Sequence, residues 1–133
     1  MRPLSDFRVC LWRTVSLSAT EMAAARASAE HGHEDSALVL SCQRMEAYGF
    51  GDCSCDAPER LHGRDSLERL AEVAAGLDSV VLGEEQIMGQ VRSALNAAPP
   101  EVRRTGDIAI AAARKLRQET SFDSHAGHLL DRA

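Results

Sequence analysis

The stretch from Gly76 to Arg92, which reads GLDSVVLGEEQIMGQVR, constrains the fold more than any other part of the chain. Gly76 predicts the end of a helix, because glycine adopts the left-handed conformation that other residues resist. A short apolar run follows, and from Glu84 onward the apolar residues recur at helical spacing, namely Ile87, Val91, Ala94, Leu95 and Ala98. The stretch therefore predicts a helix, a turn with a short buried segment, and a second helix.

The same stretch carries polar residues that can meet on one side of the predicted hairpin. Gln86 and Gln90 are four residues apart, so they lie side by side on a helix surface. Ser79 and Glu84 are close enough in sequence to join them in one small polar site. Two interpretations stay open, an ordinary helical hairpin with exposed polar residues and a binding pocket.

Composition narrows the fold class. The 133 residues form one domain of ordinary size, and 44% of them are hydrophobic but only 4% are aromatic. A core of alanine, leucine and valine suits closely packed helices better than a β-sandwich. The net charge of −5 argues against a general nucleic-acid coat, although a local basic patch stays open. No apolar run reaches the roughly 18 residues of a membrane span. The N-terminus lacks the basic segment followed by an apolar segment that is typical of a signal peptide. We therefore expect a cytoplasmic protein without a membrane partner.

The chain has four cysteines, Cys10, Cys42, Cys53 and Cys55. In a reducing cytoplasm free thiols are expected and a disulfide framework is not. The pair Cys53 and Cys55, with three histidines at positions 31, 33 and 62, suggests a metal site at first sight. The spacing matches none of the common zinc patterns, which favour C-x₂₋₄-C with a second ligand pair, so we predict no metal.

The first half of the chain predicts a small sheet and one helix. Alternation of apolar residues indicates strands, and Ser18 with Glu21 forms a capping box that begins a helix. The predicted elements are, in order, a strand at 7–14, a helix at 19–30, a strand at 36–41, a strand antiparallel to it at 44–50, and a loop at 51–58.

The second half predicts helices. Asp65 and Glu68 resemble a second N-terminal cap with its partner, and Pro99 with Pro100 separates the predicted hairpin from a last helix at about 101–119. Basic residues near the predicted end of that helix suit its dipole or could meet phosphates: Arg114, Lys115 and Arg117. The whole pattern predicts an α+β domain with a small antiparallel sheet, one or two helices beside it, and three packed helices after it.

Cys42 is a candidate nucleophile. It lies at a predicted strand end in the polar segment SCQR, and the neighbouring Arg44 would favour its thiolate. The alternative is a small buried hydrophobic residue, which is the more frequent state of a cysteine in a strand. A catalytic cysteine usually has a histidine base nearby, and no histidine stands at an obvious position here.

Three segments resemble the N-terminal catalytic domain of glutamyl-tRNA reductase: LVLSCQRMEAY, LAEVAAGLDSVVLGEEQIMGQV and AIAAARKLRQET. In that family a T-C-N-R-x-E motif supplies the cysteine that attacks the glutamyl ester of charged tRNA, and a G-L-D-S-x-V-x-G-E-x-Q-I-x-G-Q-V motif helps to form the glutamate pocket. The resemblance is dense at 38–48 and 70–120 and weak over the first 35 residues. It implies that residues 1–133 form a single catalytic domain without the NADPH-binding and dimerisation domains.

The resemblance also implies roles for individual residues. Cys42 would form a glutamyl thioester, and Arg44 would pair with a carboxylate of the glutamyl group. The other implied substrate-binding residues are Ser41, Gln43, Ser79, Glu84, Glu85, Gln86 and Gln90.

The chain departs from the family pattern at several positions. Ser41 and Gln43 replace the threonine and asparagine that flank the cysteine. Arg69 stands where the family has a histidine important for activity, so Arg69 is a possible catalytic or orienting residue. A histidine-lysine-threonine pattern becomes Trp12, Arg13 and Thr14, and no G-x-G-x-x-G phosphate loop is present.

Two functions follow from the resemblance. In the first, the protein takes the glutamyl group from glutamyl-tRNA onto Cys42, and a partner reductase with NADPH or another acyl acceptor then receives it. In the second, the protein is a non-catalytic regulatory protein that binds tRNA or haem, for which free cysteine and histidine are suitable ligands. We expect no cofactor held by this chain in the first case.

Overall fold

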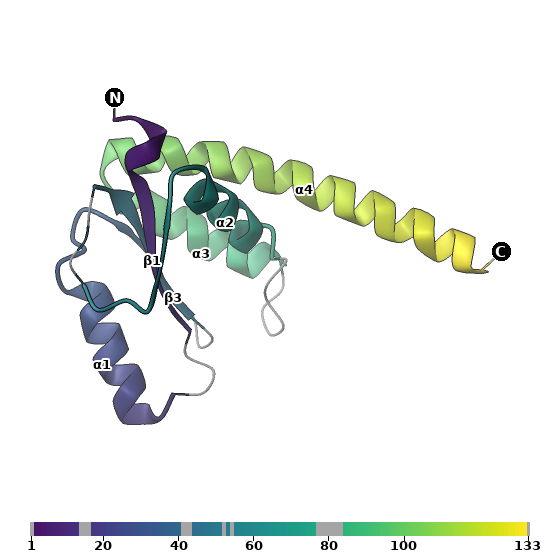
Figure 1. The fold of residues 1–133 in the computed structure, drawn as a ribbon. Coiled ribbons are helices and arrows are strands. Elements are labelled where there is room, and N and C mark those ends of the chain that lie inside the picture. The colour runs from purple at the N-terminus through teal and green to yellow at the C-terminus, as the bar shows by residue number, and fades with distance from the viewer. Residues whose placement is uncertain are drawn as a thin grey trace.

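The computed structural model describes residues 2–13, 17–40, 44–51, 53, 55–76 and 84–132, and within the last range it describes the side chains of 87–116 and 118. The predicted α+β fold is confirmed: the described residues form one four-stranded antiparallel sheet with helices on both of its faces (Figure 1). None of the helices described is both long and apolar enough to span a bilayer.

The sheet has the strand order β2-β3-β1-β4. Its central strands are β1 (Phe7–Arg13) and β3 (Arg44–Phe50), which pair along their whole lengths. The edge strands are β2 (Ala37–Leu40), paired with β3, and β4 (Glu59–His62), paired with β1. Six of the seven residues of β1 are buried, which confirms the prediction of a strand covered on both faces.

The two faces of the sheet are covered by different helices (Figure 1). After a short 3₁₀ turn at Leu4–Asp6, the chain forms β1 and then α1 (Ala19–Glu30), which lies on one face. The other face carries the larger core and the three later helices, α2 (Arg64–Ala74), α3 (Glu84–Asn96) and α4 (Pro100–Arg132).

Local sequence signals position two helix ends as predicted. The Ser18 hydroxyl accepts from the backbone N–H of Glu21 at 3.2 Å, and the Glu21 carboxylate accepts from the Ser18 N–H at 3.1 Å, so the capping box is confirmed. Gly76 has φ +75°, the left-handed conformation expected after α2, which ends at Ala74.

Two predictions about helix ends are wrong, and one strand was not predicted. The helix α2 begins at Arg64, and its N-cap residue is Gly63, which has no side chain to accept a hydrogen bond. Asp65 and Glu68 therefore do not form the predicted cap. Glu68 instead pairs with the Arg64 guanidinium at 2.9 Å. Residues after the predicted loop form the edge strand β4, because β1 offers its free edge to them. The last helix continues to Arg132, so Arg114 and Lys115 lie on exposed mid-helix positions rather than at a helix end.

Close packing of α3 against α4 depends on Gly106. A Cβ atom added there would lie 2.3 Å from a methyl carbon of Leu95, which is only 2% exposed. We therefore expect Gly106→Ala to lower the free energy of unfolding by about 1–3 kcal/mol despite alanine's better helix propensity. Chemical denaturation monitored by circular dichroism measures this loss.

The matched control is Gly89→Ala on the exposed side of α3, where an added Cβ meets nothing within 4 Å. Here only the helix propensity changes, so the free energy of unfolding should rise by up to about 1 kcal/mol. Equal effects of the two substitutions would contradict the packing described for Gly106.

Candidate functional site

The polar segment SCQR lies where two neighbouring strands meet. β2 ends at Leu40 and β3 begins at Arg44, and Leu40 pairs with Met45 across the two strands. The three predicted site residues between the strands, Ser41, Cys42 and Gln43, lie outside the described residues. The described ends of the two strands carry a buried ionic network at the start of β3 and an open hollow at the end of β2.

The ionic network is built around Glu46, whose side chain is fully buried in the middle of β3. One of its carboxylate oxygens, Oε2, accepts from Nη2 of Arg69 at 2.8 Å and from Nε of Arg69 at 3.2 Å. The same oxygen lies 3.4 Å from Nε of Arg44. Two guanidinium groups, one from the start of β3 and one from α2, therefore hold the same buried carboxylate.

The second carboxylate oxygen of Glu46 accepts a hydrogen bond from the Tyr48 hydroxyl. Burial is the main cause that raises the pKa of Tyr48 far above its ordinary value, and the negative charge of Glu46 adds to it. The phenol therefore stays protonated and remains a hydrogen-bond donor at all physiological pH values. With every carboxylate oxygen engaged, the network fixes the start of β3 against α2.

The network sharpens the expectations for two predicted site residues. Arg44 is 7% exposed on its side chain and contacts Glu46, so the structure shows a positioning contact, while its contact with a substrate carboxylate stays a prediction. Arg69, which is 10% exposed, is brought to the same place by α2. Glu46 was missed because an acid in a loosely alternating strand reads as a solvent-facing residue; its place in the R-x-E part of the motif was the available signal.

An open hollow of about 650 Å³ lies at the β2 edge of the sheet, between that strand and α3. Its lining residues are Leu38, Leu40, Gly89, Gln90, Ser93 and Ala94. Gln90 is exposed on α3 and faces this space, and Leu40 is the last residue of β2. The hollow thus joins the helix predicted to carry pocket residues to the strand end that leads into Cys42.

The remaining members of the predicted polar site are not tested by this geometry. Ser79 lies outside the described residues. Glu84, Glu85 and Gln86 belong to the first turn of α3, but their side chains lie outside the described part of the structure. The convergence of these residues with Gln90 stays a prediction.

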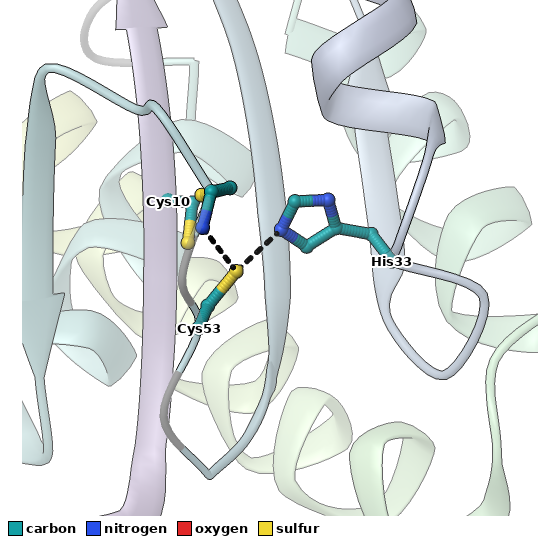
Figure 2. A group of neighbouring side chains, drawn as sticks. Cys10, His33 and Cys53 are labelled. Carbon is teal, nitrogen blue, oxygen red and sulfur yellow. Dashed lines mark hydrogen bonds between the residues drawn. The ribbon is translucent and has the colours of Figure 1, made fainter.

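A second group of reactive side chains lies on the opposite face of the sheet, beside α1 (Figure 2). Nε2 of His33 lies 3.1 Å from Sγ of Cys53, and the ligand atoms of Cys10, His33, Cys53 and Cys55 all lie within 4.8 Å of one another. Burial raises the pKa of the Cys10 thiol to about 12 and lowers the pKa of His33. The spacing in sequence did not reveal this group, because its members come from three separate segments.

The fold and these features define a class of protein, a small α+β domain with a buried ionic network at the start of one strand and an open helix-lined hollow at the end of the strand before it. A family model described as "Glutamyl-tRNAGlu reductase, N-terminal domain" matches residues 7–120. The chain therefore belongs to the family of glutamyl-tRNA reductase N-terminal domains, as the segment resemblance indicated.

Curated relatives agree with the family model. The chain is 32% identical to a glutamyl-tRNA reductase of Syntrophotalea carbinolica over 71% of this chain and 28% of the relative. It is 32% identical to a glutamyl-tRNA reductase of Idiomarina loihiensis over 89% of this chain and 34% of the relative. A "Glutamyl-tRNA reductase 2" of a Nocardioides species is 34% identical over 74% of this chain and 28% of the relative. The chain thus spans about a third or less of the length of these relatives.

Proposed function

We propose that this protein takes the glutamyl group from glutamyl-tRNA onto Cys42 as a thioester. The observation that carries the proposal is the pair of features at the two strand ends that the motif connects in sequence. Leu40 lines the open hollow and Arg44 belongs to the ionic network. Cys42 is two residues from each of them, and two residues of chain span at most about 7 Å.

The proposed chemistry is a transesterification without a redox change. The Cys42 thiolate attacks the ester carbonyl carbon, a carbon–sulfur bond forms, and the carbon–oxygen bond to the terminal ribose of the tRNA breaks. The ribose oxygen leaves with a proton taken from the thiol or from water. A thioester is reactive enough to pass its acyl group on, which is the use of a covalent intermediate.

The glutamyl group then goes to an acceptor. An amine, a thiol or water would attack the thioester carbonyl and release the Cys42 thiolate. In the alternative fate, a reduced nicotinamide cofactor bound outside these 133 residues would deliver a hydride to that carbonyl and become oxidised. The carbon–sulfur bond would then break, which releases the Cys42 thiolate and yields an aldehyde. In both fates Arg69 acts as a positioning residue, because it reaches the site through Glu46.

Discharge of charged tRNA tests the proposal. tRNA carrying labelled glutamate is incubated with the purified protein, and the label that remains on tRNA is measured over time. We expect glutamyl-tRNA to lose its label faster than in buffer alone, while tRNA charged with an apolar amino acid does not. Discharge at the buffer rate for glutamyl-tRNA would overturn the proposal.

Gln90 provides a test of the hollow as the glutamyl pocket. Its amide and the Ser93 hydroxyl are the polar side-chain groups among the α3 residues that line the hollow, and the amide is the one that offers both a donor and an acceptor on a longer side chain. We expect Gln90→Leu to slow discharge about tenfold or more, the cost of leaving one hydrogen bond to a charged ligand unmade. Discharge kinetics at limiting glutamyl-tRNA measure this change.

The matched control is Asn96→Leu, which removes an exposed amide from the end of the same helix, beside a different hollow. This variant should discharge glutamyl-tRNA at the rate of the unchanged protein. If both variants slow discharge equally, the hollow at β2 is not the glutamyl pocket.

A further inference from the structure

Three cysteines and a histidine gather beside α1, on the face of the sheet opposite the larger core. Cys10 comes from the middle of β1, His33 from the turn after α1, and Cys53 and Cys55 from the connection between β3 and β4. Cys10 is fully buried and His33 is 2% exposed. Three thiol sulfurs and one imidazole nitrogen within 4.8 Å of one another form a compact group of ligand atoms.

The geometry of the group suits one metal ion. Bonds of about 2.3 Å to sulfur and about 2.0 Å to nitrogen place the ligand atoms of a tetrahedral zinc site about 3–4 Å apart. The 3.1 Å separation between Nε2 of His33 and Sγ of Cys53 is already in this range. Small rotations of the side chains bring the remaining atoms, which lie within 4.8 Å, to the same spacing.

The surroundings of the group hold the ligands in place. The ring of Trp12 meets His33 edge-on, with 5.9 Å between the ring centroids, and fixes the plane of the imidazole. The backbone N–H of Cys55 donates a hydrogen bond to Sγ of Cys53 at 3.4 Å. In Figure 2 the dashed lines meet at this sulfur atom. Apolar side chains of the smaller core, including Met45 and Ala47, enclose the buried side.

Positive charge beside the group matches a set of thiolate ligands. Three thiolates around a divalent ion leave roughly one net negative charge. The Arg60 guanidinium of β4 donates to Sγ of Cys55 at 3.6 Å and to the Cys55 carbonyl oxygen. A charged donor to a ligand sulfur is the outer contact that tunes such sites.

We propose that Cys10, His33, Cys53 and Cys55 bind one Zn²⁺ ion in a tetrahedral structural site. Soft sulfur ligands with one imidazole select zinc among the common divalent ions, and four protein ligands leave no open position for catalysis. The ion ties the β3–β4 connection and the end of α1 to the central strand β1. This proposal does not depend on the chemistry proposed for Cys42, which lies in a different segment of the chain.

Metal content tests the site. The full chain is purified under reducing conditions, and weakly bound metal is removed. Its metal content is then measured by inductively coupled plasma mass spectrometry. We expect about one zinc per chain in the unchanged protein and nearly none in His33→Ala. The matched control His31→Ala removes an exposed histidine two residues away and should keep its zinc. His33→Cys supplies a fourth sulfur ligand and should also keep it.

Cobalt substitution reports the ligands and their geometry in the unchanged chain, so this test does not depend on whether a variant folds. Co²⁺ added to the zinc-free unchanged chain should give the thiolate charge-transfer absorption and the intense visible bands of a tetrahedral site. Absence of these bands with all thiols reduced would overturn the proposal. A disulfide between any two of the three cysteines in protein purified under reducing conditions would also overturn it. Bound iron in place of zinc would do the same.

Arg60→Gln tests the outer contact separately. The substitution leaves all four ligands in place and removes the charge beside Cys55. We expect zinc affinity, measured by competition with a chromogenic chelator, to fall about tenfold. An unchanged affinity would contradict the role given to Arg60.

Discussion

Glu46→Gln is expected to lower the free energy of unfolding by about 3–5 kcal/mol, the largest stability loss predicted for any single substitution in the domain. The reason is that Glu46 is fully buried and its carboxylate holds both Arg44 and Arg69. A neutral amide removes the buried carboxylate charge that both guanidinium groups contact. Because small domains are stable by only about 5–15 kcal/mol, equilibrium denaturation should show the loss directly.

The control is Glu59→Gln in the edge strand β4. Glu59 also accepts from an arginine, Arg13, at 3.2 Å, but both side chains are about half exposed. An exposed pair contributes less than about 1 kcal/mol, so this variant should unfold almost like the unchanged protein. A similar loss in both variants would mean that the network around Glu46 is not the buried support described here.

Cys42→Ala is expected to lower the rate of glutamyl-tRNA discharge by at least about a thousandfold, because it removes the proposed nucleophile. Binding of glutamyl-tRNA, measured by filter retention or fluorescence, should change little, because the substitution removes only one small side chain. Cys42→Ser should also be strongly impaired, since a hydroxyl is a far weaker nucleophile than a thiolate at neutral pH.

This pair of readouts separates the two functions considered for the chain. If the unchanged protein binds tRNA and Cys42→Ala has no effect on discharge, the protein acts as a binding or regulatory domain. Haem binding is tested independently by titration, where a Soret band either forms or does not. Loss of discharge with retained binding is the result that the thioester proposal requires.

Much of the fold follows from local sequence patterns, and the failures have physical causes. The strands around Val9 and Tyr48 and the capping box at Ser18 are recognisable because their signals lie within a few neighbouring residues. The strand β4 is a polar edge strand, and only its pairing with β1, about 50 residues away in sequence, defines it. The end of α4 was missed because its last turns lack apolar periodicity.

The candidate site divides in the same way. The positions of Gln90 on a helix and of Arg44 at the start of a strand could be predicted, because each follows from a local pattern, while the role of Cys42 stays a prediction. The burial of Glu46 between two arginines depends on how α2 packs on the sheet, which no spacing in the sequence records. The grouping of the three cysteines with His33 was not predicted for the same reason: the short C-x-C pair meets Cys10 and His33 only when β1 and the turn after α1 fold against it.

The Glu46 network and the proposed zinc site would stabilise opposite faces of the sheet. The network around Glu46 joins the start of β3 to α2 on the face covered by α2, α3 and α4. The proposed zinc ion would hold the opposite face, where α1 contributes a single fully buried residue, Ala29, and the core is small. A metal site is an effective support where too little apolar surface is buried to fix a loop.

The most direct test of the central claim is mass spectrometry of the protein itself after brief exposure to glutamyl-tRNA. The reaction is stopped with acid, which preserves thioesters, and the peptide that contains Cys42 is analysed with isotope-labelled glutamate as the marker. The account predicts one labelled glutamyl group on Cys42, which neutral hydroxylamine removes and which Cys42→Ala does not form. Intact glutamyl-tRNA with an unmodified Cys42 peptide, or label on any other residue, would contradict it.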